Sequence, residues 1–286
     1  FNASNTYVGD TIALNDRIEL GADHPFGTGR VSLEPNTTVS LVADSVLVTN
    51  DVTGSGALVV TAGQEADFTG DVTLGSVTLG GEGATLGVGG TLRAGTLAMG
   101  LGTVAKGLSA GSRLVLDSAE GELLGTFTGD LTVEKAGVGE VTLVGEQNHT
   151  GGTVVSEGTL KVSAGATFSG CEVVFGDGAS LGIDGDSTDA EYLAKGVDLT
   201  NLALTTGDSL LVKVESAQSS RPERMVALVT DTTDKAATLA AKIVAKLVLA
   251  DGRARRCAVS CVPNADGMTS TVYADCRTQG LMLLLR

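Results

Sequence analysis

Apolar residues alternate with small polar ones along most of this 286-residue chain, in runs of three to five positions that end at glycine, asparagine or aspartate. Alternation with a period of two is typical of a β-strand that buries one face. The intervals are too short for crossover helices, and no helical pattern precedes residue 230. The predicted strands lie at 31–33, 38–42, 45–50, 57–60, 71–74, 76–79, 113–116, 130–135, 140–144, 159–162, 172–175 and 202–206.

Many short strands suit two architectures: a sandwich or barrel built from hairpins, and a parallel β-solenoid whose coils stack on one another. The pattern favours the solenoid, because glycines recur as corners in GDVTLGSVTLGGEGATLGVGGTLRAGTLAMG (70–100) and leave little room for long loops. Threonine, valine and leucine also recur in the same local frame. We therefore predict an all-β parallel β-helix over residues 1–207, with about ten coils and a length on the order of 50 Å at about 4.8 Å per coil.

One phrase is repeated: QNHTGGTVVSEGTLKV (147–162) echoes NTYVGDTIALNDRIEL (5–20) from 142 positions earlier. Both copies contain a turn, Tyr/His-x-Gly-x-Thr, followed by apolar positions six residues apart. Glycine permits a positive φ at a corner, and we interpret the phrase as one coil of a stack. The matched positions are Tyr7 with His149, Gly9 with Gly151, Thr11 with Thr153, Ile12 with Val154, Ile18 with Leu160 and Leu20 with Val162.

The second copy resembles the autotransporter-associated β-strand repeat of bacterial passenger domains, through Gly151-Gly152-Thr153 and Gly158-Thr159-Leu160. The first copy departs from that pattern, with Asp10 at the second glycine and Asp16-Arg17-Ile18 in place of Gly-Thr-Leu. It keeps the downstream Phe26-Gly27-Thr28-Gly29. The resemblance implies a right-handed parallel β-helix, export to the cell surface and no chemistry of its own.

Residues 208–286 follow a different pattern, which predicts a capping or assembly segment. A solenoid end exposes unpaired backbone groups and its apolar interior, so it needs a cover or a docking partner. We expect a short helix within 231–249, whose apolar face holds Leu239, Ile243 and Leu247 and whose N-cap is Thr232, Thr233 or Asp234. The other expected elements are strands at 209–216, 224–230 and 281–285 and a hairpin of 254–262 with 268–276 around the turn 263–267.

Composition restricts the core and the partners. The chain is 42% hydrophobic but only 3% aromatic, with 40 glycines and no tryptophan, so an aliphatic core is expected. Residues 1–207 carry 26 acidic and 8 basic residues, whereas residues 208–286 carry 8 and 11. The acidic body disfavours DNA or RNA as a partner. The contrast fits either an ordinary soluble acidic surface or an electrostatic match between the ends of neighbouring subunits.

Four cysteines are present, and three of them, Cys257, Cys261 and Cys276, lie near the C-terminal end of the sequence. The absence of a CxxC pair and the distance of both histidines weaken a zinc site, so a disulfide in an oxidising compartment is favoured. The predicted hairpin brings Cys257 near Cys276, which we favour as the pair. Cys257 with Cys261 requires a bent strand, because positions four apart in a strand are too distant. The fourth cysteine is Cys171.

Nothing in the sequence predicts a membrane-spanning helix or an export leader. No apolar run approaches the roughly 20 residues that a helix needs to cross a bilayer. The chain opens on Phe1-Asn2-Ala3-Ser4 without a basic, apolar leader, which we interpret as a mature or trimmed fragment.

Catalytic and binding motifs are mostly absent. There is no GxSxG elbow, and we interpret His24 and His149 as turn residues. Asp184, Asp186 and Thr188 match the first ligands of a calcium loop, but the glycine and closing glutamate are missing. Glycine-rich runs lack the Lys-Ser/Thr of a phosphate loop. No metal and no cofactor are therefore predicted.

These observations lead to a non-enzymatic structural protein of a bacterial cell surface, a β-helical stalk or fibre subunit. Acidic N-terminal coils could stack on the basic C-terminal end of the next copy and give a head-to-tail homopolymer. Two alternatives remain: an adhesin passenger that binds a host or cell-surface ligand, and a polysaccharide-active β-helix enzyme. A groove with clustered carboxylates and tyrosines would favour the enzyme.

Overall fold

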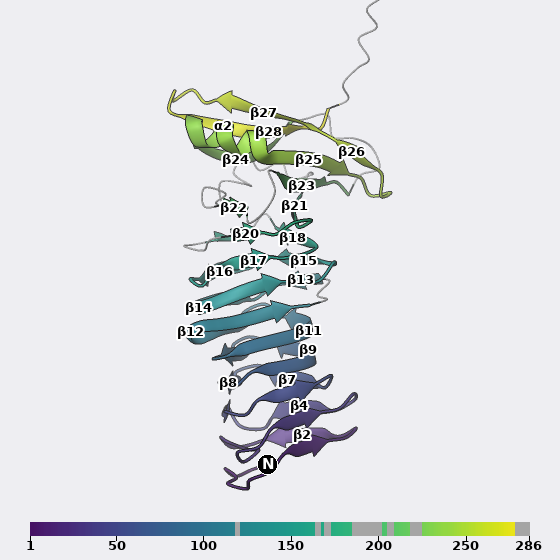
Figure 1. Cartoon of the computed structure of the whole chain (residues 1–286), viewed down its shortest axis with the longest axis vertical. Coiled ribbons are helices and arrows are strands. Elements are labelled where there is room, and N and C mark those ends of the chain that lie inside the picture. Colours follow the sequence, from purple (N-terminus) through teal and green to yellow (C-terminus); the bar gives the residue numbers. More distant parts are fainter. Residues whose placement is uncertain are drawn as a thin grey trace, which may run out of the picture.

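A computed structural model of the chain shows a parallel β-solenoid with a C-terminal cap (Figure 1). The fold predicted from the sequence is thus confirmed: 58% of the described residues are in strands, and the coils make about 8 turns. About ten coils were expected. The structure describes residues 1–117, 121–163, 167–168, 173–184, 202–204, 209–217 and 225–277.

The strands of successive coils stack in three parallel ladders, here named A, B and C in the order in which the chain meets them. In ladder A the Cα partners run Val52, Val72, Leu92, Leu114 and Val133, one from each successive coil. Ladder A consists of β1 (Thr11–Ala13), β3 (Val31–Leu33), β6 (Val52–Gly54), the first half of β9 (Val72–Gly80), the first half of β11 (Thr91–Met99), the second half of β12 (Val104–Leu116), the second half of β14 (Thr126–Lys135), β17 (Thr153–Val155), β20 (Val173–Phe175) and β22 (Leu202–Leu204).

Ladders B and C complete the triangular coil. Ladder B consists of β2 (Arg17–Leu20), β4 (Thr38–Leu41), β7 (Ala57–Thr61), the second halves of β9 and β11, β13 (Gly121–Leu123), β15 (Glu140–Leu143), β18 (Thr159–Val162), β21 (Ser180–Asp184), β23 (Leu210–Glu215) and β25 (Ile243–Val248). Ladder C consists of β5 (Ser45–Val48), β8 (Glu65–Phe68), β10 (Thr85–Val88), the first halves of β12 and β14, β16 (Glu146–His149) and β19 (Thr167–Phe168).

The core is the aliphatic interior of the coils. The five stacked residues of ladder A named above are at most 3% exposed, and the same alternation continues in the other two ladders. Parallel in-register stacking places each aliphatic side chain on a similar one, so a column of like residues fills the axis. The corners need residues without side chains: a Cβ on Gly75, inside β9, would collide with the carbonyl oxygen of Ser55 one coil earlier.

The cap is a three-stranded antiparallel sheet covered by one helix. Its order is β24 (Met225–Thr232), β28 (Thr269–Asp275) and β27 (Ala258–Pro263), and α2 (Thr233–Lys242) packs against all three strands (Figure 1). The predicted hairpin turn is present, with Pro263 paired to Ser270. The first predicted hairpin strand is divided, because β26 (Ala254–Arg256) pairs antiparallel with β25 instead.

The predicted helix was too long at its C-terminal end. It ends at Lys242, and Ile243 and Leu247 lie in β25, whose partners in β23 are Leu210 and Val214. The segment is extended because β23 gives each residue from Ile243 to Val248 a parallel partner. The chain therefore leaves the solenoid after β23, builds β24 and α2 of the cap, and returns to add one more rung. The predicted strand 281–285 lies outside the described residues.

Candidate functional site

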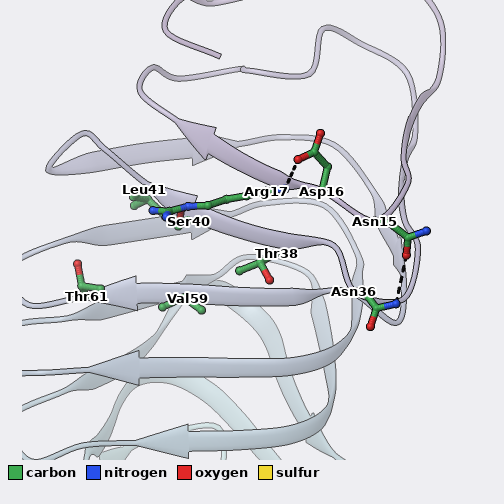
Figure 2. Close-up of a pocket in the computed structure, with 9 residues that line it drawn as sticks. All are labelled: Asn15, Asp16, Arg17, Asn36, Thr38, Ser40, Leu41, Val59 and Thr61. Carbon is green, nitrogen blue, oxygen red and sulfur yellow. Dashed lines mark hydrogen bonds between the residues drawn. The ribbon is translucent and has the colours of Figure 1, made fainter.

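The candidate binding site is a shallow lateral groove of about 600 Å³ on ladder B, near the N-terminal end of the rod (Figure 2). It lies over β2, β4 and β7, on the outer surface of ladder B. Its walls are polar except for two aliphatic residues. The lining residues are Asn15, Asp16, Arg17, Asn36, Thr38, Ser40, Leu41, Val59 and Thr61.

Arg17 is the one basic residue among those that line the groove. The Arg17 guanidinium donates a hydrogen bond from Nε to Ser40 Oγ (3.3 Å) and pairs with Glu19 (3.2 Å), while two-thirds of its side chain stays exposed. At the corner, Asn36 Nδ2 donates to Asn15 Oδ1 at 3.2 Å (Figure 2). Both asparagines have positive φ, which their short polar side chains tolerate. The groove therefore offers amide, hydroxyl and guanidinium groups for hydrogen bonding to a polar ligand.

Carboxylates gather at a second place, further along ladder B. Lys161 Nζ lies 2.5 Å from Glu215 and 3.9 Å from Glu140, and Lys213 Nζ donates to Thr159 Oγ1 at 2.6 Å. Burial is the main cause that raises the pKa of Glu140, and a hydrogen bond with Glu215 raises this pKa further. Raised carboxyl pKa values are typical of acid–base sites, but the lysine between these two carboxyls makes the group a charge-neutralising network.

A third group spans ladder C. Lys106 reaches back two coils to form ion pairs with Glu65 and, at 3.9 Å, with Asp67. It passes over Gly87, where a Cβ would collide with Asp67 Oδ1. Burial raises the pKa of Asp67, and the positive charge of Lys106 opposes that shift. The group ties three consecutive coils together.

The sequence did not indicate these charged groups, because their members belong to different coils and only the coil register joins them.

The repeated phrase forms the same corner in both copies. Tyr7 Oη and Thr11 Oγ1 are hydrogen-bonded at 2.5 Å, and His149 Nε2 and Thr153 Oγ1 at 2.8 Å. Thr11 and Thr153 begin β1 and β17, seven rungs apart in ladder A. In each copy the aromatic side chain of the turn is therefore hydrogen-bonded to the threonine hydroxyl at the start of the next strand.

The other repeat residues shape the corners and the core. Gly9 and Gly152 have φ values of 149° and 90°. A Cβ on Gly151 would lie 2.6 Å from the backbone of Leu131. Leu160 is buried in ladder B at 3% exposure.

Gly158 accommodates a buried lysine that the sequence analysis missed. The Lys135 side chain is 1% exposed, and its ammonium donates to the carbonyl oxygens of Gly137 and, at 3.4 Å, of Glu157. A Cβ on Gly158, whose φ is 77°, would lie 2.8 Å from Lys135 Nζ. The alternation of apolar residues hides this lysine, since it occupies the position of Leu116 and Val155 in neighbouring rungs.

The favoured cysteine pair is brought together. The Sγ atoms of Cys257 and Cys276 are 3.6 Å apart in the cap, and no S–S bond joins them in this structure. Cys261 lies in β27, opposite Val272. Cys171 lies outside the described residues, as does most of the loop 184–191 that was compared with a calcium site.

Metal-ligand clusters and membrane helices were searched for within the described part of the chain. No group there of three or more histidine, cysteine, aspartate or glutamate side chains is placed to hold a metal ion. No described helix is long and apolar enough to span a bilayer.

Comparison with known proteins gives no relative: no family model, no curated protein and no solved structure matches this chain.

Proposed function

We propose that the chain is a non-enzymatic structural protein of a bacterial cell surface, a β-solenoid rod that acts as a stalk or fibre subunit. The observation that carries this proposal is the continuity of ladder B, whose rungs stay parallel from β2 to β25. A rod built this way transmits force through the backbone hydrogen bonds between successive coils. The extracellular, secreted location comes from the repeat resemblance alone.

Side chains reinforce the same axis. Asp10 Oδ1 accepts the backbone N–H of Arg30 one coil later, at 2.9 Å. Asp51 and Asp71 accept the N–H groups of the equivalent residues in their next coils, at 3.0 and 2.8 Å. Such columns satisfy corner donors that ladder bonding leaves over, so they stiffen the corners as well as the faces.

Head-to-tail assembly is part of the proposal, and the two ends of the rod support it. Five large apolar residues of the first 14 positions are at least 40% exposed, and β1 pairs on one side only among the described strands. At the other end all of β26 is exposed; it pairs only with β25 among the described strands, and it carries Arg255 and Arg256. The first coil carries exposed Asp10, Asp16, Glu19 and Asp23. A join between these unlike surfaces propagates as a filament.

Electron microscopy and sedimentation of the purified chain test both parts. We expect rods that associate end to end at low salt, and we expect Arg255→Glu/Arg256→Glu to abolish the association. Lys235→Glu/Lys242→Glu on the exposed face of α2 makes the same charge change and should leave association intact. Single rods under all conditions would refute the assembly part alone, whereas globular particles would refute the rod.

A specific observation favours the adhesin alternative. The lateral groove around Arg17 exposes amide, hydroxyl and guanidinium groups for hydrogen bonding, which suits a polar surface ligand such as a glycan. If the purified chain binds glycans on an array and Arg17→Ala does not, adhesion replaces the purely structural role.

A further inference from the structure

Two thiols meet where the cap joins the last rung of the solenoid. Cys257 lies between β26 and β27, and Cys276 directly follows β28. Both side chains are buried, at 6% and 2% exposure, and both belong to the main apolar core. Their sulfurs are 3.6 Å apart, within hydrogen-bonding distance for thiols.

The strand register fixes this juxtaposition. Ala258 and Asp275 are paired in the antiparallel β27–β28 ladder, so Cys257 and Cys276 face each other one step beyond. Directly opposite residues of antiparallel strands have Cα atoms about 4.5–5.5 Å apart, and disulfides need about 4.4–6.8 Å. A rotation about the side-chain bonds therefore brings the sulfurs to bonding distance without moving the strands.

We propose that Cys257 and Cys276 are a disulfide-forming site that staples the cap to the end of the solenoid. The co-reactant is a small-molecule or protein disulfide. One cysteine thiolate attacks it and releases one thiolate, which gives a mixed disulfide. The second cysteine thiolate attacks the mixed disulfide and releases the other thiolate. The two cysteines lose two electrons and two protons, and the co-reactant is reduced to two thiols.

The staple joins the end of the cap sheet to the residue at which the chain passes from the solenoid strand β26 to the cap strand β27. The Cys257 N–H donates to the carbonyl oxygen of Ala245 in β25, at 2.9 Å, so this residue is bonded to the last solenoid rung. Cys276 directly follows β28, the central strand of the cap sheet. A bond between them closes a loop over residues 258–275 and restricts the unfolded cap, which is the main source of disulfide stabilisation.

Burial of both thiols affects how the bond forms. The thiolate is the reacting species, and an apolar environment disfavours it, so a soluble disulfide reacts slowly with the folded cap. The bond should therefore form during folding or when the cap opens. This inference is independent of the proposed function, because it holds for any β-solenoid that carries this cap.

The test is oxidative refolding of the full chain with oxidised and reduced glutathione, compared with refolding in excess reductant. Alkylation of remaining thiols and peptide mapping without reduction should identify a Cys257–Cys276 link. The oxidised chain should unfold about 5–10 °C higher than the reduced chain, as expected for a loop of this size. This comparison uses one sequence in two redox states, so no variant has to fold.

Cys261→Ser is the matched control, since Cys261 lies further along β27 and faces Val272. It should keep both the link and the thermal shift, while Cys276→Ser should lose both. Recovery of Cys257 and Cys276 fully alkylated after oxidative refolding would overturn the proposal. A link from either residue to Cys171 or Cys261 would overturn it as well.

Discussion

At the residue scale, the two copies of the repeat make the same side-chain hydrogen bond at their corner, one with a tyrosine and the other with a histidine. Tyr7 is 40% exposed, whereas His149 is buried, and each bonds the threonine four residues later. His149 also packs edge-on against Phe127, with ring centroids 5.9 Å apart. Burial lowers the pKa of His149 to about 4, and a hydrogen bond to the backbone of Gly152 only partly opposes this shift. The ring is therefore neutral at pH 7.

This lowered pKa predicts an acid-sensitive coil. The pKa of His149 is about 4 when folded, below the value of 6.5 that an exposed histidine has, so the unfolded chain takes up the proton first as the pH falls. The stability contribution is complete above pH 6.5 and is lost progressively toward pH 4, by about 3 kcal/mol in total. Denaturant unfolding of the native chain and of His149→Gln between pH 7 and 4 measures the difference.

The variant should show a smaller loss of stability over that range, because glutamine does not titrate. His24→Gln is the control for the substitution itself, since His24 is exposed at a corner of the first coil. Parallel pH curves for His149→Gln and the native chain would contradict the assignment.

At the element scale, β25 shows how the same residues can suit two structures. Leu239, Ile243 and Leu247 are four apart, which is a helical spacing, but Ile243, Ala245 and Leu247 also alternate and are all at most 5% exposed. In a helix Ala245 would face away from Ile243. In the strand it faces the core. The parallel edge of β23 decides between the two, because it pairs every residue from Ile243 to Val248.

Ala245→Glu distinguishes these structures. A carboxylate at this 0% exposed position has no partner from the aliphatic interior, so we expect the cap to lose several kcal/mol of stability. The measurement is thermal or denaturant unfolding together with limited proteolysis of the cap.

Lys246→Glu is the matched control, because Lys246 is the exposed neighbour in the same strand. Its substitution should change stability by less than about 0.5 kcal/mol. If Ala245→Glu is equally silent, the segment is a helix.

At the scale of the whole molecule, each coil contacts mainly the coils before and after it. Stability in such an array is a sum of coil and interface contributions, so end coils are held on one side only. The first coil is an example: β1 has β3 as its one partner among the described strands, and Ile12 is 65% exposed. Central coils such as those of β9 and β11 have neighbours on both sides.

Hydrogen exchange should therefore be graded along the rod. Amides of β9 and β11 should exchange more than about tenfold slower than those of β1 and β2 under native conditions. Exchange followed by mass spectrometry resolves these segments, and peptides of equal length from β4 give an intermediate value. Uniform protection from β1 to β11 would mean that the rod unfolds as one cooperative unit.

The sequence by itself determined the fold class and the local structure of the coils. Alternation between Val, Leu and Thr predicts strands, the recurring glycines of residues 70–100 predict corners, and the repeat at residues 5–20 and 147–162 predicts one coil of a stack. These features depend on neighbouring residues, so a single sequence reveals them. The turn at residues 263–267 was predictable for the same reason, since Pro263, Asn264 and Gly267 form it locally.

Only the tertiary structure decided which distant residues meet. The groove at Arg17 and Ser40, the network of Glu140 with Glu215, and the buried Lys135 all depend on a register between coils that spacing alone does not give. The return of the chain to form β25 depends in turn on the free edge of β23. Backbone hydrogen bonds between coils supply the free energy that sets these partners, and that term exists only once the coils have stacked.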